Sequence, residues 1–118
     1  MNPDDLLIET LEGLCLPVFR QGSLSGEDAY PQRFYTYWVQ STEGKAFYDN
    51  RMESMTTWDI QVAFYSTSPS DAILGLGRAL GALGHKGFIV SGLGYDIGSD
   101  EQSHTGRAAR VSFIEKRR

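Results

Sequence analysis

The stretch Thr56–Ser66, with the sequence TTWDIQVAFYS, has the most regular alternation of apolar and polar side chains in the chain. Every second residue in its middle is large and apolar: Trp58, Ile60, Val62 and Phe64. A repeat of two residues places these side chains on one face of a β-strand. We therefore predict a strand over Thr56–Ser66 with this face in the core.

The stretch Arg33–Gln40 is also predicted to be a strand, and it carries large side chains on both faces. One face would hold Phe34, Thr36 and Trp38, and the other Tyr35, Tyr37 and Val39. Aromatic residues on both faces indicate a central strand covered on both sides, or a strand with one face left for contact with another subunit.

Two helices are predicted, one before and one after these strands in the sequence. The first begins at Pro3 after a capping Asn2 and ends at Gly13. The second spans Pro69–Leu83, with Ser68 as its N-cap and Asp71 as the acceptor of a capping box. Its apolar stripe is predicted to consist of Ile73, Leu76, Leu80 and Leu83.

The remaining segments are predicted to be short strands, turns and loops. Further strands are predicted at Leu16–Arg20, Ala46–Asp49, Gly87–Ser91, Tyr95–Ile97 and Ala108–Ile114. A long loop is predicted at Gln21–Pro31, a hairpin turn at Ser41–Lys45 and a second connection at Asn50–Met55. This order of elements indicates an α+β fold, with two helices packed on one face of a mainly antiparallel or mixed sheet. We expect residues 1–118 to form a single domain.

The composition argues against several classes of protein. A net charge of −4 and a pI of about 5.0 disfavour general nucleic-acid binding, which needs a basic surface. Cys15 is the single cysteine, so no disulfide can form within the chain. The acidic start lacks the basic region of a signal peptide, and no apolar run reaches the ~20 residues of a membrane span. We therefore expect synthesis in a reducing cytosol and no association with a membrane.

No motif points to catalysis, a metal or a cofactor. The glycines of Gly75–Gly81 lie inside a predicted helix and lack the spacing of a dinucleotide-binding loop, so they indicate close packing. His85 and His104 lack the neighbouring ligands of a zinc site. We expect no catalytic residue, no metal and no cofactor. A small hydrolase that uses the region Asp96–Arg107 stays open as a less favoured alternative.

Three groups of residues are candidates for contact with a neighbouring subunit. The second aromatic face of Arg33–Gln40 contributes Tyr35, Tyr37 and Val39. The glycine-rich helix contributes Gly77 and Gly81, and the basic end of the sequence contributes Arg107 and Arg110. Charge attraction between this basic end and the acidic first helix would suit a head-to-tail contact, although two solvated charged surfaces are the simpler interpretation.

Several short segments carry a resemblance to a known family. They are Pro17–Ser23, Phe34–Trp38, Phe47–Asn50, Trp58–Ser66, Gly87–Ile89, Gly94–Ile97 and Ser103–Arg107. In their order and spacing, the chain resembles proteins encoded among the head–tail connection genes of siphophages and prophages of Gram-positive bacteria. That family is similar to the tail terminators of lambda-like phages.

This resemblance implies a structural protein of the virion tail or neck that is made in the cytoplasm of a bacterial host. A hexameric ring of the chain would cap the tail tube and join the tail to the head, with DNA passing through it. Its partners would be other copies of itself, the major tail protein and head connector proteins. The resemblance implies no enzyme activity, cofactor or specific nucleic-acid binding. A head-completion or adaptor protein of the same particle is the alternative.

Overall fold

Three long strands form the centre of the sheet in the computed structural model: β2 (Arg33–Ala46), β3 (Ser54–Ser66) and β6 (Thr105–Arg117). The structure describes residues 3–20, 31–46, 54–92, 94–98 and 104–117. β3 lies between β2 and β6 and is antiparallel to both. The strand predicted from the alternation in Thr56–Ser66 is therefore confirmed, and it is the central strand of the fold.

Three short strands extend this sheet to six strands. β1 (Val18–Arg20) pairs with β2 in parallel, whereas β4 (Ile89–Val90) and β5 (Tyr95–Ile97) pair antiparallel with β6. The predicted α+β fold is confirmed, and the sheet is mixed because of the single parallel pair. The predicted strands Leu16–Arg20 and Gly87–Ser91 are shorter in the structure, and Ala108–Ile114 belongs to a longer one.

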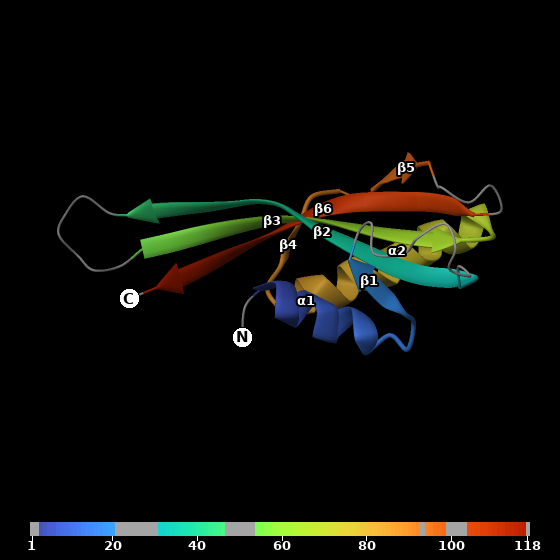
Figure 1. Ribbon diagram of the computed structural model, residues 1–118, viewed down its shortest axis with the longest axis horizontal. Coiled ribbons are helices and arrows are strands. Elements are labelled where there is room, and N and C mark those ends of the chain that lie inside the picture. Colours follow the sequence, from blue (N-terminus) through green and yellow to red (C-terminus); the bar gives the residue numbers. More distant parts are fainter. Residues whose placement is uncertain (1–2, 21–30, 47–53, 93, 99–103, 118) are drawn as a thin grey trace.

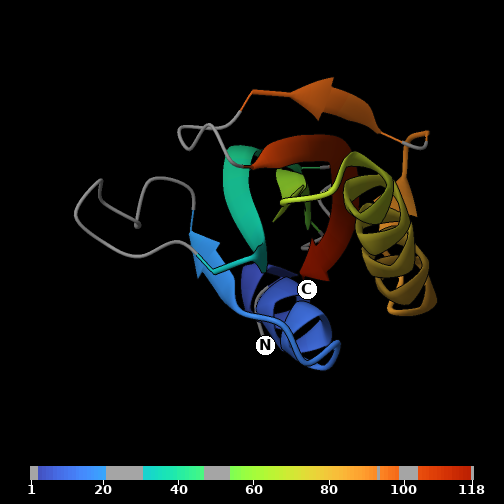
Figure 2. The ribbon, with the colours of Figure 1, turned by 90° about the vertical axis from the view of Figure 1, so that its right-hand side faces the viewer.

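Both helices cover one face of the sheet, while β5 lies on the opposite side of the molecule (Figures 1 and 2). α1 (Pro3–Glu12) buries Leu7 and Leu11, and α2 (Pro69–His85) buries Leu76 and Leu83. These side chains pack in a single core with the apolar face of β3, which comprises Trp58, Ile60, Val62 and Phe64. No helix in the described ranges has the length and apolar character to cross a membrane.

The other face of the sheet holds a second, smaller core. It consists of Phe34, Ala63, Tyr65 and Ala108, with Phe19 and Ile97 packed against it. Phe34 stacks on Tyr65, with ring centroids 5.2 Å apart. At this end of β2 both faces of the strand are covered within one chain, as one of the two interpretations of its aromatic pattern predicted.

The hairpin turn predicted at Ser41–Lys45 is wrong. β2 continues through these residues to Ala46 and pairs with β3, with a β-bulge between Val39 and Ser41. Of the strand predicted at Ala46–Asp49, residues 47–49 lie outside the described residues, as do most of the connection at Asn50–Met55 and of the loop at Gln21–Pro31. Polar residues with a glycine suggested a turn, but here they form a strand that leaves the body of the protein.

Residues 42–46 of β2, 54–58 of β3 and 113–117 of β6 pair with one another in a three-stranded extension, which we call the arm. The arm projects from the end of the body where α1 begins (Figure 1). It gives the molecule an elongated shape, 55 Å along its longest axis and 27 and 23 Å across.

Two predicted details of α2 are also wrong. The side chain of Ser68 makes no capping hydrogen bond, although Ser68 is the N-cap residue. Ile73 was predicted to lie in the apolar stripe, but its side chain is 50% exposed, while Ala72, Gly75 and Ala79 are buried. The small residues bring the helix close to the sheet and turn its buried face away from Ile73.

Candidate subunit interface

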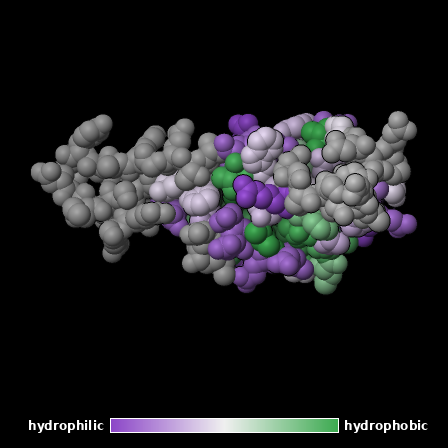
Figure 3. Space-filling model, in the orientation of Figure 1, coloured by the Kyte–Doolittle hydropathy of each residue, from purple (hydrophilic) through white to green (hydrophobic). Residues whose placement is uncertain are grey.

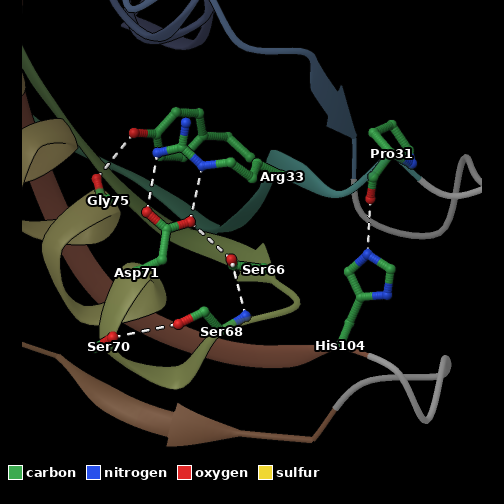
Figure 4. Close-up of polar contacts among 9 residues, drawn as sticks. Pro31, Arg33, Ser66, Ser68, Ser70, Asp71, Gly75 and His104 are labelled. Carbon is green, nitrogen blue, oxygen red and sulfur yellow. Dashed lines mark hydrogen bonds and ion pairs between the residues drawn. The ribbon is translucent and has the colours of Figure 1, made fainter.

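A polar network fixes the start of α2 against the sheet (Figure 4). The guanidinium group of Arg33 donates two hydrogen bonds to the carboxylate of Asp71, at 2.8 and 3.0 Å. The hydroxyl of Ser66 donates to the same carboxylate at 2.7 Å and accepts a 3.2 Å bond from the backbone N–H of Ser68. Asp71 therefore joins the first turn of α2 to β2 and to the end of β3.

The surroundings of Asp71 favour its charged form. The hydrogen bond from Ser66 lowers the pKa of the Asp71 carboxyl, and the hydrogen bond and positive charge of Arg33 lower it further. Partial burial acts in the opposite direction and is outweighed. The network binds Asp71 within the subunit and has the geometry of a structural clamp.

Tyr35 lies inside the fold, which corrects its prediction as an interface residue. Its side chain is 1% exposed and its hydroxyl donates a 2.8 Å hydrogen bond to the carbonyl of Gly75. Burial raises the pKa of this phenol. Tyr37 and Val39 follow on the same face and are half-buried against the larger core. This face of β2 is turned toward the helices, so a neighbouring subunit cannot reach Tyr35.

The uncovered part of the opposite sheet face presents different candidates. Trp38 is 51% exposed and Ile114 is 42% exposed on this face. Arg110 is also exposed there and lies in the same row as Trp38, with Gln61 of β3 between them. Arg110, predicted as an interface residue, therefore lies on an accessible surface. The alternation in β2 already placed Trp38 on this face, but only the structure reveals that the second core ends before it.

The outer surface of α2 is the second accessible candidate. A Cβ atom added at Gly77 or Gly81 would meet nothing within 4 Å, so both predicted glycines are open to solvent. Beside them, Ile73 is 50% exposed and Leu74 is 65% exposed. Gly75 differs, because a Cβ atom there would lie 2.3 Å from the buried ring of Phe64. The predicted packing role of the glycines is therefore confirmed for Gly75 alone.

Arg107 is half-buried and held within the subunit. Its guanidinium group pairs with the exposed carboxylate of Asp96 at 2.9 Å and donates to the carbonyl of Gly94 at 3.1 Å. His104 bonds through Nε2 to the carbonyl of Pro31 at 2.7 Å, and its ring meets Phe34 edge-on. Residues 99–103 of the hydrolase alternative lie outside the described residues. Within the described ranges no group of three or more His, Cys, Asp or Glu side chains could hold a metal ion.

The described residues on the side of the body drawn in Figure 3 do not form a single broad apolar area. In the orientation of Figure 3, hydrophobic residues form small groups among hydrophilic ones. Small groups of apolar residues are normal on protein surfaces and by themselves indicate no partner.

No protein-family model and no curated protein matches this sequence.

Proposed function

We propose that this chain is a structural subunit of a tailed phage or prophage, which forms a ring at the head-proximal end of the tail tube. The ring would cap the tube and join the tail to the head. The observation that carries the proposal is the presence of exposed large apolar side chains on two opposite sides of one small subunit. Trp38 and Ile114 lie on one side, and Ile73 and Leu74 lie on the other.

Two different surfaces are what a closed ring requires. Each copy in a ring contacts one neighbour through one surface and the other neighbour through a second, unlike surface. Trp38 lies on the sheet face away from the helices, whereas Leu74 lies on the outer side of α2. Large apolar and aromatic side chains of this kind form the centres of protein–protein interfaces. The open backbone at Gly77 and Gly81 would let a neighbour approach α2 closely.

The resemblance of the sequence supports the position of the ring in the particle. It suggests the major tail protein and the head connector proteins as partners, and it suggests that DNA passes through a channel at the centre of the ring. The net charge of −4 suits a channel that does not hold DNA. The proposal needs no metal, cofactor or catalytic residue.

The direct test measures assembly of the purified chain, alone and on tail tubes from the particle that encodes it. Light scattering and electron microscopy should detect hexameric rings, which Trp38→Ala and Leu74→Ser should weaken. Tyr95→Ala and Ile89→Ser are matched controls, because these residues are as exposed but belong to neither surface. A wild-type chain that stays monomeric at high concentration and does not bind tubes would refute the proposal.

Particles that lack the protein separate this role from the alternative of head completion. Loss of a tail terminator should give over-long tails that are not attached to heads. Tailless or leaking heads would instead assign the protein to head completion. Electron microscopy of a lysate distinguishes the two results.

A further inference from the structure

We infer that neighbouring copies are joined through the arm, where the outer edge of β2 in one copy pairs with the outer edge of β6 in the next. The inference rests on the proposed function, because it states how the ring is closed. Its basis is the backbone pairing of the described strands.

In the body, short strands cover parts of the outer edges of β2 and β6, whereas in the described part of the chain none covers these edges in the arm. β1 pairs with β2 at Tyr35–Tyr37, and β5 and β4 pair with β6 at Gly106–Ala108 and Val111–Ser112. Within the described ranges, no strand pairs with the outer edge of residues 42–46 or of residues 113–117. Neither stretch contains proline, so each residue keeps its backbone N–H. Within the described residues, both edges therefore offer backbone groups for pairing with another strand.

The direction of the backbone groups in β6 follows from its pairing in the body. The N–H of Ser91 donates to the carbonyl of Arg110, so the backbone groups of Arg110 point away from β3. Successive residues in a strand direct their backbone N–H and carbonyl groups alternately toward the neighbouring strand on one side and on the other. Because the register between β3 and β6 is unbroken, Ile114 also directs its N–H and carbonyl outward from the arm.

The same reasoning applies to β2. The N–H of Tyr35 donates to the carbonyl of Pro17, so the backbone groups of Tyr35 point away from β3. The backbone N–H and carbonyl of its partner Phe64 therefore point toward β6. Because this direction alternates along β3, the backbone N–H and carbonyl of Trp58 also point toward β6. Beyond the β-bulge, Trp58 pairs with Thr42, so Thr42 directs its N–H and carbonyl outward.

A second copy of this chain fits these edges better than a foreign strand does. The two edges lie on opposite sides of the same arm and have matching lengths, residues 42–46 and 113–117. Both strands are antiparallel to β3, so they run parallel to each other toward the tip. In a ring with aligned arms, each β2 would meet the neighbouring β6 in parallel, and every outer edge would be paired. A foreign strand would satisfy one edge and leave the other open.

Proline substitutions at the two outward positions test this pairing. Thr42→Pro and Ile114→Pro each remove one outward N–H and leave the bonds to β3 in place. Thr42→Val and Ile114→Val keep the N–H and are the matched controls. We expect both valine variants to form rings and both proline variants to lose them, with thermal unfolding used to verify that all four are folded.

Mixing the two proline variants gives a result that simple destabilisation cannot produce. Thr42→Pro retains the β6 edge, and Ile114→Pro retains the β2 edge. One copy of each should therefore pair into a dimer that cannot grow further. Light scattering of the mixture should detect dimers, while each variant alone stays monomeric.

Cross-linking examines the same contact without proline. Glu43 and Ile114 lie in one row with Thr57 between them and therefore share a face of the sheet. Cysteines at these two positions in a Cys15→Ser background should give a ladder of covalent oligomers with a short bifunctional thiol reagent, and each single variant should give none. Rings from both proline variants, or no ladder from assembled double-cysteine rings, would overturn the inference and leave the proposed function standing. A wild-type chain that forms no ring alone or on tubes would overturn both.

Discussion

The hydroxyl of Tyr35 donates a 2.8 Å hydrogen bond to the backbone carbonyl of Gly75, and so joins β2 to the middle of α2. The ring of Tyr35 also packs against Phe64, with centroids 4.7 Å apart. Phe64 in turn lies against the bare Cα of Gly75. One tyrosine, one phenylalanine and one glycine thus set the distance between the helix and the sheet.

Tyr35→Phe should lower the free energy of unfolding by about 1 kcal/mol, because a buried hydrogen bond is lost while the ring remains. The loss should shrink at alkaline pH. Burial raises the pKa of Tyr35 in the folded state, so above pH ~10 the unfolded state releases this proton first and the wild type loses stability. Chemical denaturation at neutral pH and above pH 10 checks both effects, and Tyr95→Phe, at an exposed tyrosine, should leave the stability at neutral pH unchanged.

Gly75→Ala should destabilise the fold by about 1–3 kcal/mol, because the new methyl group would overlap the buried ring of Phe64. Gly77→Ala is the matched control in the same helix. Since nothing lies near its added Cβ, it should raise stability by up to about 1 kcal/mol through helix propensity. Thermal unfolding of the two variants should therefore shift in opposite directions, and a stabilised Gly75→Ala protein would contradict the close packing of α2 on the sheet.

Asp71→Asn should cost about 1–3 kcal/mol at neutral pH, because Arg33 and Ser66 lose a charged acceptor. The pKa of Asp71 is lowered in the folded state. Its contribution is therefore complete above the unfolded pKa of about 4 and disappears as the pH falls through the lower folded value. Denaturation curves between pH 2 and 7 should converge for wild type and variant at the acid end, whereas a constant difference would show that the charge of Asp71 is irrelevant.

Asp96→Asn should change the free energy of unfolding by about 0.5 kcal/mol or less. The ion pair of Asp96 with Arg107 is 2.9 Å long, but the side chain of Asp96 is largely exposed and water screens the attraction. Urea denaturation provides the measurement, and a loss comparable to that of Asp71→Asn would contradict this estimate.

Local patterns in the sequence predicted the elements whose environment repeats regularly. β3 alternates because one face of it contacts the helices, and the stripes of Leu7 and Leu11 or of Leu76 and Leu83 follow from helices with one buried side. The failures have equally physical causes. In the arm, the polar residues of Ser41–Lys45 suggested a turn, since a strand that projects from the body has no continuous core to impose alternation on it.

Contacts between distant residues could not be predicted in the same way. Arg33 meets Asp71 across 38 positions, and this pair draws Asp71 away from the capping box predicted with Ser68. For a related reason, some of the predicted interface residues are buried and others are exposed. Sequence placed Tyr35 and Trp38 on opposite faces of β2, but which face the helices would cover depended on how α1 and α2 pack.

The central position of β3 also determines the order in which the fold can be completed during synthesis. β2 and β3 leave the ribosome together and can pair at once, whereas the partner on the other side of β3 is β6, which emerges only after α2, β4 and β5. Until then one side of β3, including the backbone of Ile60 and Val62, has no strand beside it. The nascent chain therefore carries an open central strand while residues 67–104 are synthesised, and this is the stage at which it is most vulnerable to aggregation.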